Sequence, residues 1–79
     1  MESTDLYKRL TSIFHDVFGN DALVLTPTLT AKDVEGWDSF NHIRLILTVQ
    51  KAFGIKIAAH EIPKLQNVGQ LAELVQRKA

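Results

Sequence analysis

The stretch from Glu35 to Leu47, EGWDSFNHIRLIL, places a serine directly after an aspartate, where a loop becomes a strongly apolar segment. A hydroxyl in such a position can cap a helix, act as a nucleophile or receive a covalent group. Aspartate and serine are common N-caps because their side-chain oxygens accept hydrogen bonds from free N–H groups of the first helical turn. As a cap alone, Asp38 or Ser39 would contribute about 1 kcal/mol to stability.

The other chemistry that these residues offer has little support. Ser39 and His42 can share a helix face by their spacing, but the chain has no G-x-S-x-G turn and little room for an oxyanion hole. No histidine is paired with another at a spacing typical of metal ligands, and there is no G-x-x-x-x-G-K-S/T phosphate loop. We therefore expect no catalytic residue and no metal site.

Composition restricts the class of protein further. With 79 residues, one domain over residues 1–79 is expected. The absence of cysteine excludes disulfides and thiolate chemistry, so any thiol must come from a cofactor. The net charge is zero and the basic residues are scattered, which does not favour nucleic-acid binding. A charged N-terminus and the lack of a long apolar run argue against a signal peptide and a membrane span, so a cytoplasmic protein is expected.

Apolar residues recur at helical spacing in three segments. The first predicted helix covers about residues 5–18, with Ser3 and Thr4 as candidate N-caps and Gly19 as its stop. A loop over residues 20–37 follows, and its many apolar residues indicate that it lies across the other elements.

The second half of the chain completes the fold. A second helix is predicted over residues 39–53, then a short helical turn over residues 59–63 and a last helix that begins at Asn67 as N-cap. Gln70 follows in a capping-box-like position. We predict an all-α four-helix bundle, with three main helices, one short helix and a long loop between the first two.

The second predicted helix has an apolar arc wider than a surface helix needs. The side predicted to face the core consists of Leu45, Ile46, Val49, Ala52 and Phe53. The opposite, polar face consists of Asn41, Arg44, Thr48 and Lys51. An apolar flank lies between the two and consists of Phe40, Ile43 and Leu47. The centre of the bundle is predicted to contain Leu10, Phe14, Leu45, Val49, Phe53 and Leu71. The flank is then apolar surface left over for another contact.

The segment from Gly36 to Phe40, G-W-D-S-F, resembles the attachment site of acyl carrier proteins and their peptidyl and aminoacyl relatives. In that family the motif G-x-D-S, followed by a large aliphatic residue, begins the second of four helices. The resemblance extends through DSFNHIRLILTVQKAFGIKI, with its Phe-Gly stop and I-x-I link, and covers nearly the whole chain. Phe40, in place of an aliphatic residue, and Trp37 are bulkier than is usual there.

The resemblance implies that Ser39 receives 4′-phosphopantetheine from coenzyme A, through a separate phosphopantetheinyl transferase with Mg²⁺. Asp38 would help that transferase recognise the site. The protein would then be a non-catalytic, monomeric carrier that holds acyl groups as thioesters. Its further partners would be an acyl- or aminoacyl-loading ligase or transferase, and downstream acyl-processing enzymes.

The charge of the second helix departs from the family pattern. The carrier of fatty-acid synthesis has an acidic second helix, whereas Arg44 and Lys51 give residues 39–53 a charge of +2 with no acid to offset it. We expect Phe40, Ile43 and Leu47, with these two cations, to contact partners in a dedicated lipid or secondary-metabolite pathway. Two alternatives stay open: an aminoacyl or peptidyl carrier loaded by an adenylating ligase, and an unmodified helical adaptor that binds through the apolar flank.

Overall fold

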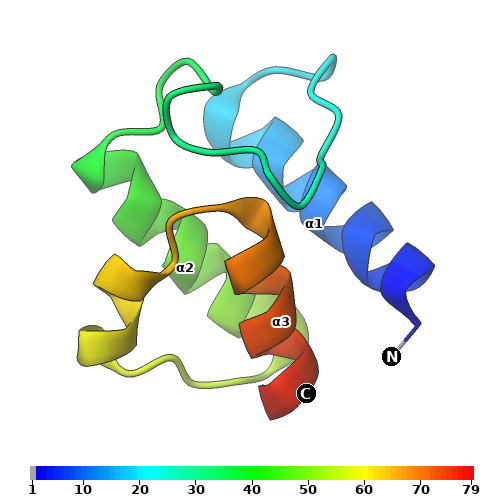
Figure 1. The fold of residues 1–79 in the computed structure, drawn as a ribbon, viewed down its shortest axis with the longest axis vertical. Coiled ribbons are helices and arrows are strands. Elements are labelled where there is room, and N and C mark those ends of the chain that lie inside the picture. Colours follow the sequence, from blue (N-terminus) through cyan, green and yellow to red (C-terminus); the bar gives the residue numbers. More distant parts are fainter. Residues whose placement is uncertain (1) are drawn as a thin grey trace.

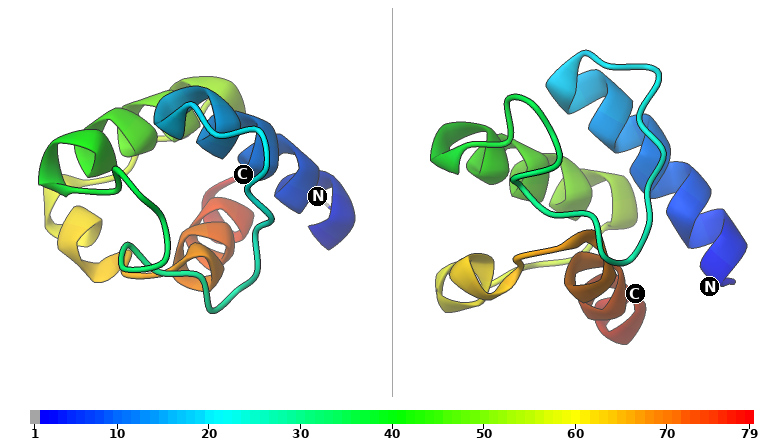
Figure 2. Two further views of the ribbon diagram at one scale, coloured as in Figure 1. Left: turned by 90° about the horizontal axis from the view of Figure 1, so that it is seen from above. Right: turned by 45° about the horizontal axis from the view of Figure 1, so that its top comes forward.

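The computed structural model describes residues 2–79 and contains four helices joined by irregular segments. In chain order these are α1 (Ser3–Phe18), α2 (Ser39–Phe53), the 3₁₀ helix η1 (Ala59–Lys64) and α3 (Val68–Lys78). α1 and α2 lie side by side, and η1 and α3 lie on the opposite side of the molecule (Figures 1 and 2). No strand occurs among residues 2–79, so the predicted all-α bundle is confirmed. None of these helices is both long and apolar enough to cross a membrane.

The end of α1 agrees with the predicted helix over about residues 5–18, but α1 begins earlier, at Ser3, and its cap differs from the prediction. The N-cap position is Glu2, whose side chain makes no capping hydrogen bond, so the prediction of Ser3 or Thr4 as N-cap is wrong. Both residues already lie inside the helix, where a side chain cannot cap the first turn in the usual geometry. The helix ends at Gly19, as predicted. Its buried stripe consists of Leu6, Leu10, Ile13 and Phe14.

The core confirms five of the six predicted central residues. The buried residues among them are Leu10, Phe14, Leu45, Val49 and Leu71. Phe53 is only partly buried and Ala52 is exposed, so their assignment to the core is wrong. The reason is a polar neighbour: the guanidinium of Arg9 in α1 lies 4.1 Å from the Phe53 ring centroid and donates a hydrogen bond to the Ala52 carbonyl. The last turn of α2 therefore lies at the rim of the core.

The long loop between α1 and α2 packs across the bundle, as its apolar content predicts (Figure 1). Leu23, Leu25 and Leu29 pack partly against the core, and Val34 is buried. The loop is also hydrogen-bonded to α3, since the Val68 and Gly69 amides donate to the carbonyls of Leu29 and Pro27 at 3.0 and 2.9 Å. A Cβ atom at Gly69 would lie only 2.9 Å from that Pro27 oxygen, so this close approach requires glycine.

The predicted N-cap of the last helix is confirmed. The Asn67 side chain accepts a hydrogen bond from the Gln70 amide at 2.8 Å. The Gln70 side chain accepts from the Gln66 amide at 2.7 Å, one residue earlier than in a standard capping box. The short turn before it is η1, with Pro63 inside it, one residue longer than predicted.

Candidate functional site

The start of α2 separates the roles of the two residues that the sequence offered as caps. Asp38 is the N-cap, and its Oδ1 accepts a hydrogen bond from the Asn41 amide at 2.9 Å. Ser39 is the first helical residue, is exposed, and makes no side-chain hydrogen bond to any part of residues 2–79. Capping therefore does not occupy the Ser39 hydroxyl, which is left free to react.

A tight turn at Gly36 lies directly before the first residue of α2. Gly36 has a φ of +89°, a left-handed conformation that favours glycine. The Gly36 carbonyl accepts hydrogen bonds from the Asp38 amide at 3.0 Å and from the Asn41 side-chain amide at 2.7 Å. The turn directly before Asp38 and Ser39 therefore explains why the motif has glycine at position 36, because the turn needs a left-handed backbone there.

Trp37 anchors this turn to α1. Its side chain is only 7% exposed. Its ring meets Phe14 edge-on, at 5.4 Å between centroids and 81° between planes, and lies 5.8 Å from the ring of Phe18. The sequence indicated Trp37 only as a bulky neighbour of the serine. Its burial was missed because it depends on two aromatic residues of another helix.

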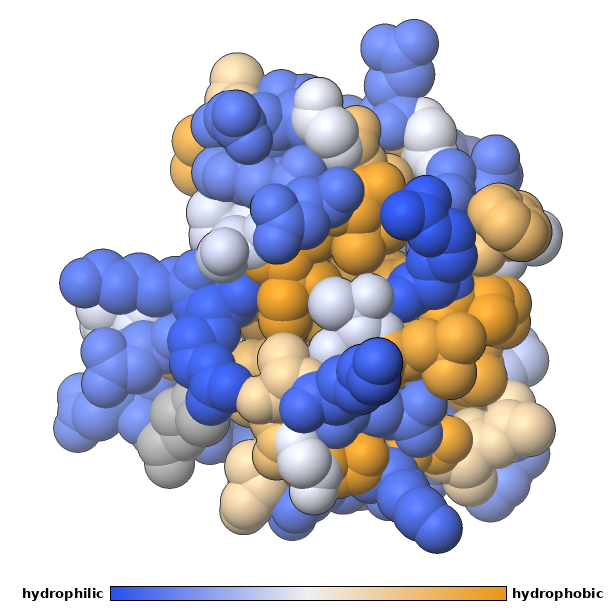
Figure 3. Space-filling model, turned by 180° about the vertical axis from the view of Figure 1, so that it is seen from behind, coloured by the Kyte–Doolittle hydropathy of each residue, from blue (hydrophilic) through white to orange (hydrophobic). Residues whose placement is uncertain are grey.

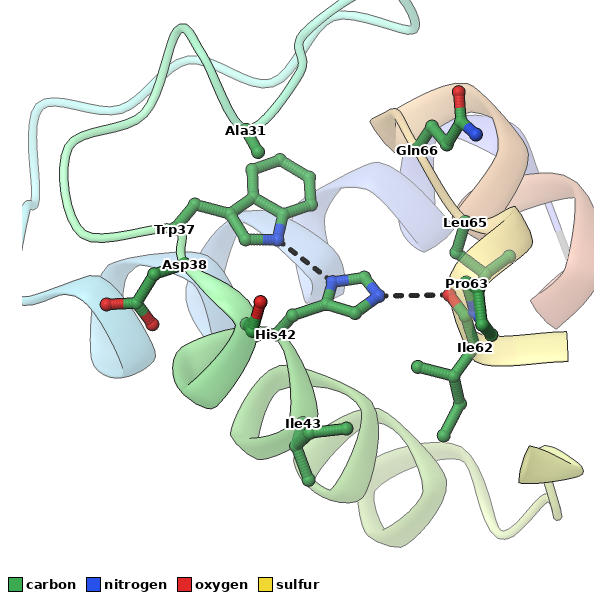
Figure 4. A pocket seen from close by; sticks show the side chains of 10 residues that line it. Ala31, Trp37, Asp38, His42, Ile43, Ile62, Pro63, Leu65 and Gln66 are labelled. Carbon is green, nitrogen blue, oxygen red and sulfur yellow. Dashed lines mark hydrogen bonds between the residues drawn. The ribbon is translucent and has the colours of Figure 1, made fainter. Parts of the chain in front are cut away.

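His42 is not available to Ser39 as a base. Its Nδ1 accepts a hydrogen bond from the indole Nε1–H of Trp37 at 3.0 Å, and its Nε2 lies 3.1 Å from the Ile62 carbonyl oxygen. Both ring nitrogens are therefore engaged by other residues (Figure 4). This geometry argues against the Ser39–His42 pair that the spacing allowed.

A pocket of about 530 Å³ lies between the start of α2 and η1 (Figure 4). Asp38 and Ser39 contribute to its lining, together with Trp37 and His42. Apolar side chains form much of the remaining wall; these are Ile43, Ile62, Pro63 and Leu65. The pocket opens beside the free hydroxyl, so a group attached to Ser39 would have an apolar surface next to it.

The apolar flank of α2 is exposed, as predicted. Phe40, Ile43 and Leu47 have exposed fractions of 72%, 45% and 56%. Seen from behind, the face that α1 and α2 form shows apolar side chains gathered among hydrophilic ones (Figure 3). By their exposed fractions, Phe40, Ile43 and Leu47 remain uncovered in the folded chain, so they are available to a partner.

The polar face of α2 carries unpaired positive charge. Arg44 and Lys51 are exposed, and neither forms an ion pair within residues 2–79. Together with Leu47 and Lys56 they line a second groove of about 650 Å³, whose described lining contains no acidic residue. The same residues 2–79 contain no cluster of histidine, aspartate or glutamate that could hold a metal ion.

Comparisons with known proteins agree on one family. The family model described as "Phosphopantetheine attachment site" matches residues 8–75. An acyl carrier protein of Thermotoga maritima is 23% identical over 74 residues, which is 94% of this chain and 91% of that protein. The solution structure of a holo acyl carrier protein from Geobacter metallireducens has a TM-score of 0.86 and 44% identity, and the match covers 92% of this chain and 84% of that one.

Proposed function

Because this chain belongs to the phosphopantetheine-attachment family of acyl carrier proteins, we propose that Ser39 is the residue that carries its 4′-phosphopantetheine. Proteins of this family are non-catalytic carriers that a phosphopantetheinyl transferase modifies. The observation that carries the assignment is the free, exposed hydroxyl of Ser39 at the first position of α2, directly after the capping Asp38.

The residues around Ser39 suit such a group. The first N–H groups of a helix have no intrahelical acceptor and carry a partial positive charge, which favours a phosphate. The Asp38 carboxylate neutralises part of that charge, but it is held by the Asn41 amide. When bound, the group supplies a thiol that holds acyl chains as thioesters, a chemistry that a chain without cysteine lacks. Ile43, Ile62 and Leu65 then offer apolar contacts close to Ser39.

Intact-protein mass spectrometry tests this function directly. The chain is incubated with coenzyme A, Mg²⁺ and a transferase of broad specificity, and one phosphopantetheine mass is expected. An unchanged mass would favour the adaptor that binds through Phe40, Ile43 and Leu47 without modification. Loading the modified protein with fatty acids and with amino acids, by the corresponding ligases, then separates an acyl carrier from an aminoacyl carrier. The exposed flank and the apolar pocket support the acyl carrier.

Asp38 is proposed to have a second role, in recognition by the transferase. Replacing Asp38 with Asn keeps a good N-cap but removes the charge, so stability is expected to change little. Attachment is expected to slow on the order of tenfold, the effect of losing one charge-assisted interaction of about 1.5 kcal/mol. Replacing Asp38 with Ala should give the same slowing and also destabilise the fold by about 1 kcal/mol. Equal attachment rates for wild type and Asp38→Asn would leave Asp38 with the cap alone.

We further propose that α2 docks on partners whose surface is acidic or apolar. The exposed side chains Phe40, Ile43 and Leu47 lie beside the cations Arg44 and Lys51. Like charges that face one another across an interface are costly, so these cations would reject the basic surfaces that fit acidic carriers. A specialised carrier, served by its own loading enzyme and its own acyl-processing enzymes, follows from this surface.

Charge reversal on α2 tests the partner surface. The double variant Arg44→Glu with Lys51→Glu is expected to keep the melting temperature, since exposed charges contribute little to stability. Transfer to the cognate partner should weaken on the order of tenfold at low salt, and the loss should shrink as salt screens the charges. Function with enzymes of ordinary fatty-acid synthesis should improve.

The matched control for this test reverses one lysine and one arginine on other elements, Lys8→Glu in α1 with Arg77→Glu in α3. Both residues are exposed. This control has the same net charge as the test variant, so it separates a local docking effect from a general effect of charge. If the two double variants behave alike, or neither alters the kinetics, the proposed role of Arg44 and Lys51 fails.

A further inference from the structure

A chain of two hydrogen bonds joins three segments beside Ser39. Trp37 lies in the turn before α2, His42 lies in the first turns of α2, and Ile62 lies in η1. The indole Nε1–H donates to Nδ1 of His42 at 3.0 Å, and the His42 Nε2 is 3.1 Å from the Ile62 carbonyl oxygen. Figure 4 shows the imidazole between the indole and η1.

The partners of His42 determine its protonation state. An indole N–H can only donate and a backbone carbonyl can only accept. The His42 ring must therefore carry its proton on Nε2 and leave the lone pair of Nδ1 for Trp37. The rings of Trp37 and His42 are tilted by only 22°, which lets the indole N–H point at that nitrogen. Only the neutral Nε2–H form of His42 satisfies both contacts.

We propose that neutral His42 is a positioning residue that holds the wall of the pocket beside Ser39, and that its protonation releases Trp37. When Nδ1 takes a proton from solvent, its lone pair enters the new N–H bond and Trp37 loses its acceptor. Two N–H groups then face each other where one hydrogen bond was. Nε2–H still donates to the Ile62 carbonyl, so the break falls between the turn and α2, while η1 stays attached to α2.

The surroundings of these residues make the pocket sensitive to that break. Trp37 and His42 both line it. η1 contains no fully buried residue. Its contacts with the other helices include the hydrogen bond between His42 and the Ile62 carbonyl, and a 3.5 Å ion pair between Glu61 and Lys78 of α3. A shift of the indole thus changes one wall of the pocket, opposite the wall that Ile62 and Leu65 form.

The titratable groups on the segments packed around His42 can be named one by one. Among residues 2–79, Asp38 is the one acidic or basic residue that lines the pocket together with His42, and its carboxylate accepts a hydrogen bond from the Asn41 amide. The other titratable groups on the packed segments are engaged elsewhere or exposed. In the loop, the Asp33 carboxylate accepts hydrogen bonds from Thr30, and Glu35 is exposed. In η1, Glu61 forms an ion pair with Lys78, and His60 and Lys64 are exposed. On α1, the His15 ring contacts the Leu23 carbonyl.

NMR of the full chain tests the proposal, because its single tryptophan gives a single indole N–H signal. At about pH 8, the ¹⁵N shifts of the His42 ring should be those of the Nε2–H form. Between about pH 8 and pH 5, where histidines usually titrate, the indole signal should move along the same curve as the His42 ring signals. The result should be the same in the Ser39→Ala chain, so it is independent of whether Ser39 is the attachment site.

Two variants sharpen the test. In His42→Gln, an amide can accept from Trp37 and donate to Ile62 without titrating, so the indole signal should no longer depend on pH in this range. In the matched control His60→Gln, which removes an exposed histidine, the indole titration should be unchanged. An Nδ1–H form at pH 8, or an indole signal that does not follow His42 in the wild type, would overturn the proposal. The wild-type titration decides the matter even if His42→Gln does not fold.

Discussion

Replacing Ser39 with Ala is expected to abolish phosphopantetheine attachment while leaving the fold intact. The hydroxyl is the proposed attacking group, and without it no phosphodiester can form at this position. The fold should tolerate the change because Ser39 is exposed, makes no side-chain hydrogen bond within residues 2–79, and leaves the capping to Asp38. Alanine is also a good helix former. Intact mass after treatment with coenzyme A and transferase measures the first effect, and a thermal melt measures the second.

Ser12 provides the matched control for this variant. It is a serine on the exposed face of α1, so Ser12→Ala removes an accessible helical hydroxyl elsewhere in the chain. Ser12→Ala should accept one phosphopantetheine at the wild-type rate. Full modification of Ser39→Ala would show that another hydroxyl is the attachment site. Loss of cooperative melting in Ser39→Ala would show that Ser39 also has a structural role.

Replacing Phe14 with Ala is expected to have the largest effect on stability. Phe14 is fully buried, and its ring lies 5.6 Å from that of Phe18 and 5.4 Å from that of Trp37. Removing a buried phenylalanine costs about 3–5 kcal/mol through lost burial and the cavity left behind. Since small domains have a total stability of about 5–15 kcal/mol, the melting temperature should fall by about 15 °C or more. Denaturant unfolding and a thermal melt measure the loss.

Phe53→Ala is the comparison that tests the corrected core. Phe53 is partly buried beneath Arg9 at the rim, so its loss should cost only about 1–2 kcal/mol, including a cation–π contact of about 0.5–1 kcal/mol. The same residue type is removed at both positions, which isolates the effect of position. Equal destabilisation by the two variants would mean that the last turn of α2 belongs to the core after all.

Local patterns in the sequence determined the helices and the position of the candidate site. The stripe of α1, the stop at Gly19 and the cap at Asn67 depend on residues within about one turn of each other, and spacing alone therefore predicts them. The exposed flank of α2 followed from the same periodicity. The resemblance around Asp38 and Ser39 then indicated the family, because that motif begins the second helix.

Only the tertiary structure decided how the segments meet. Trp37 is buried because the loop brings it against Phe14 and Phe18 of another helix, and no local period encodes that approach. Phe53 lies on the core stripe by spacing, yet a side chain of α1 covers it at the rim. His42 finds one partner 5 residues away and another 20 residues away, so its tautomer depends on the placement of η1. Contacts between segments far apart in the chain depend on how the helices pack, which helical periodicity does not specify.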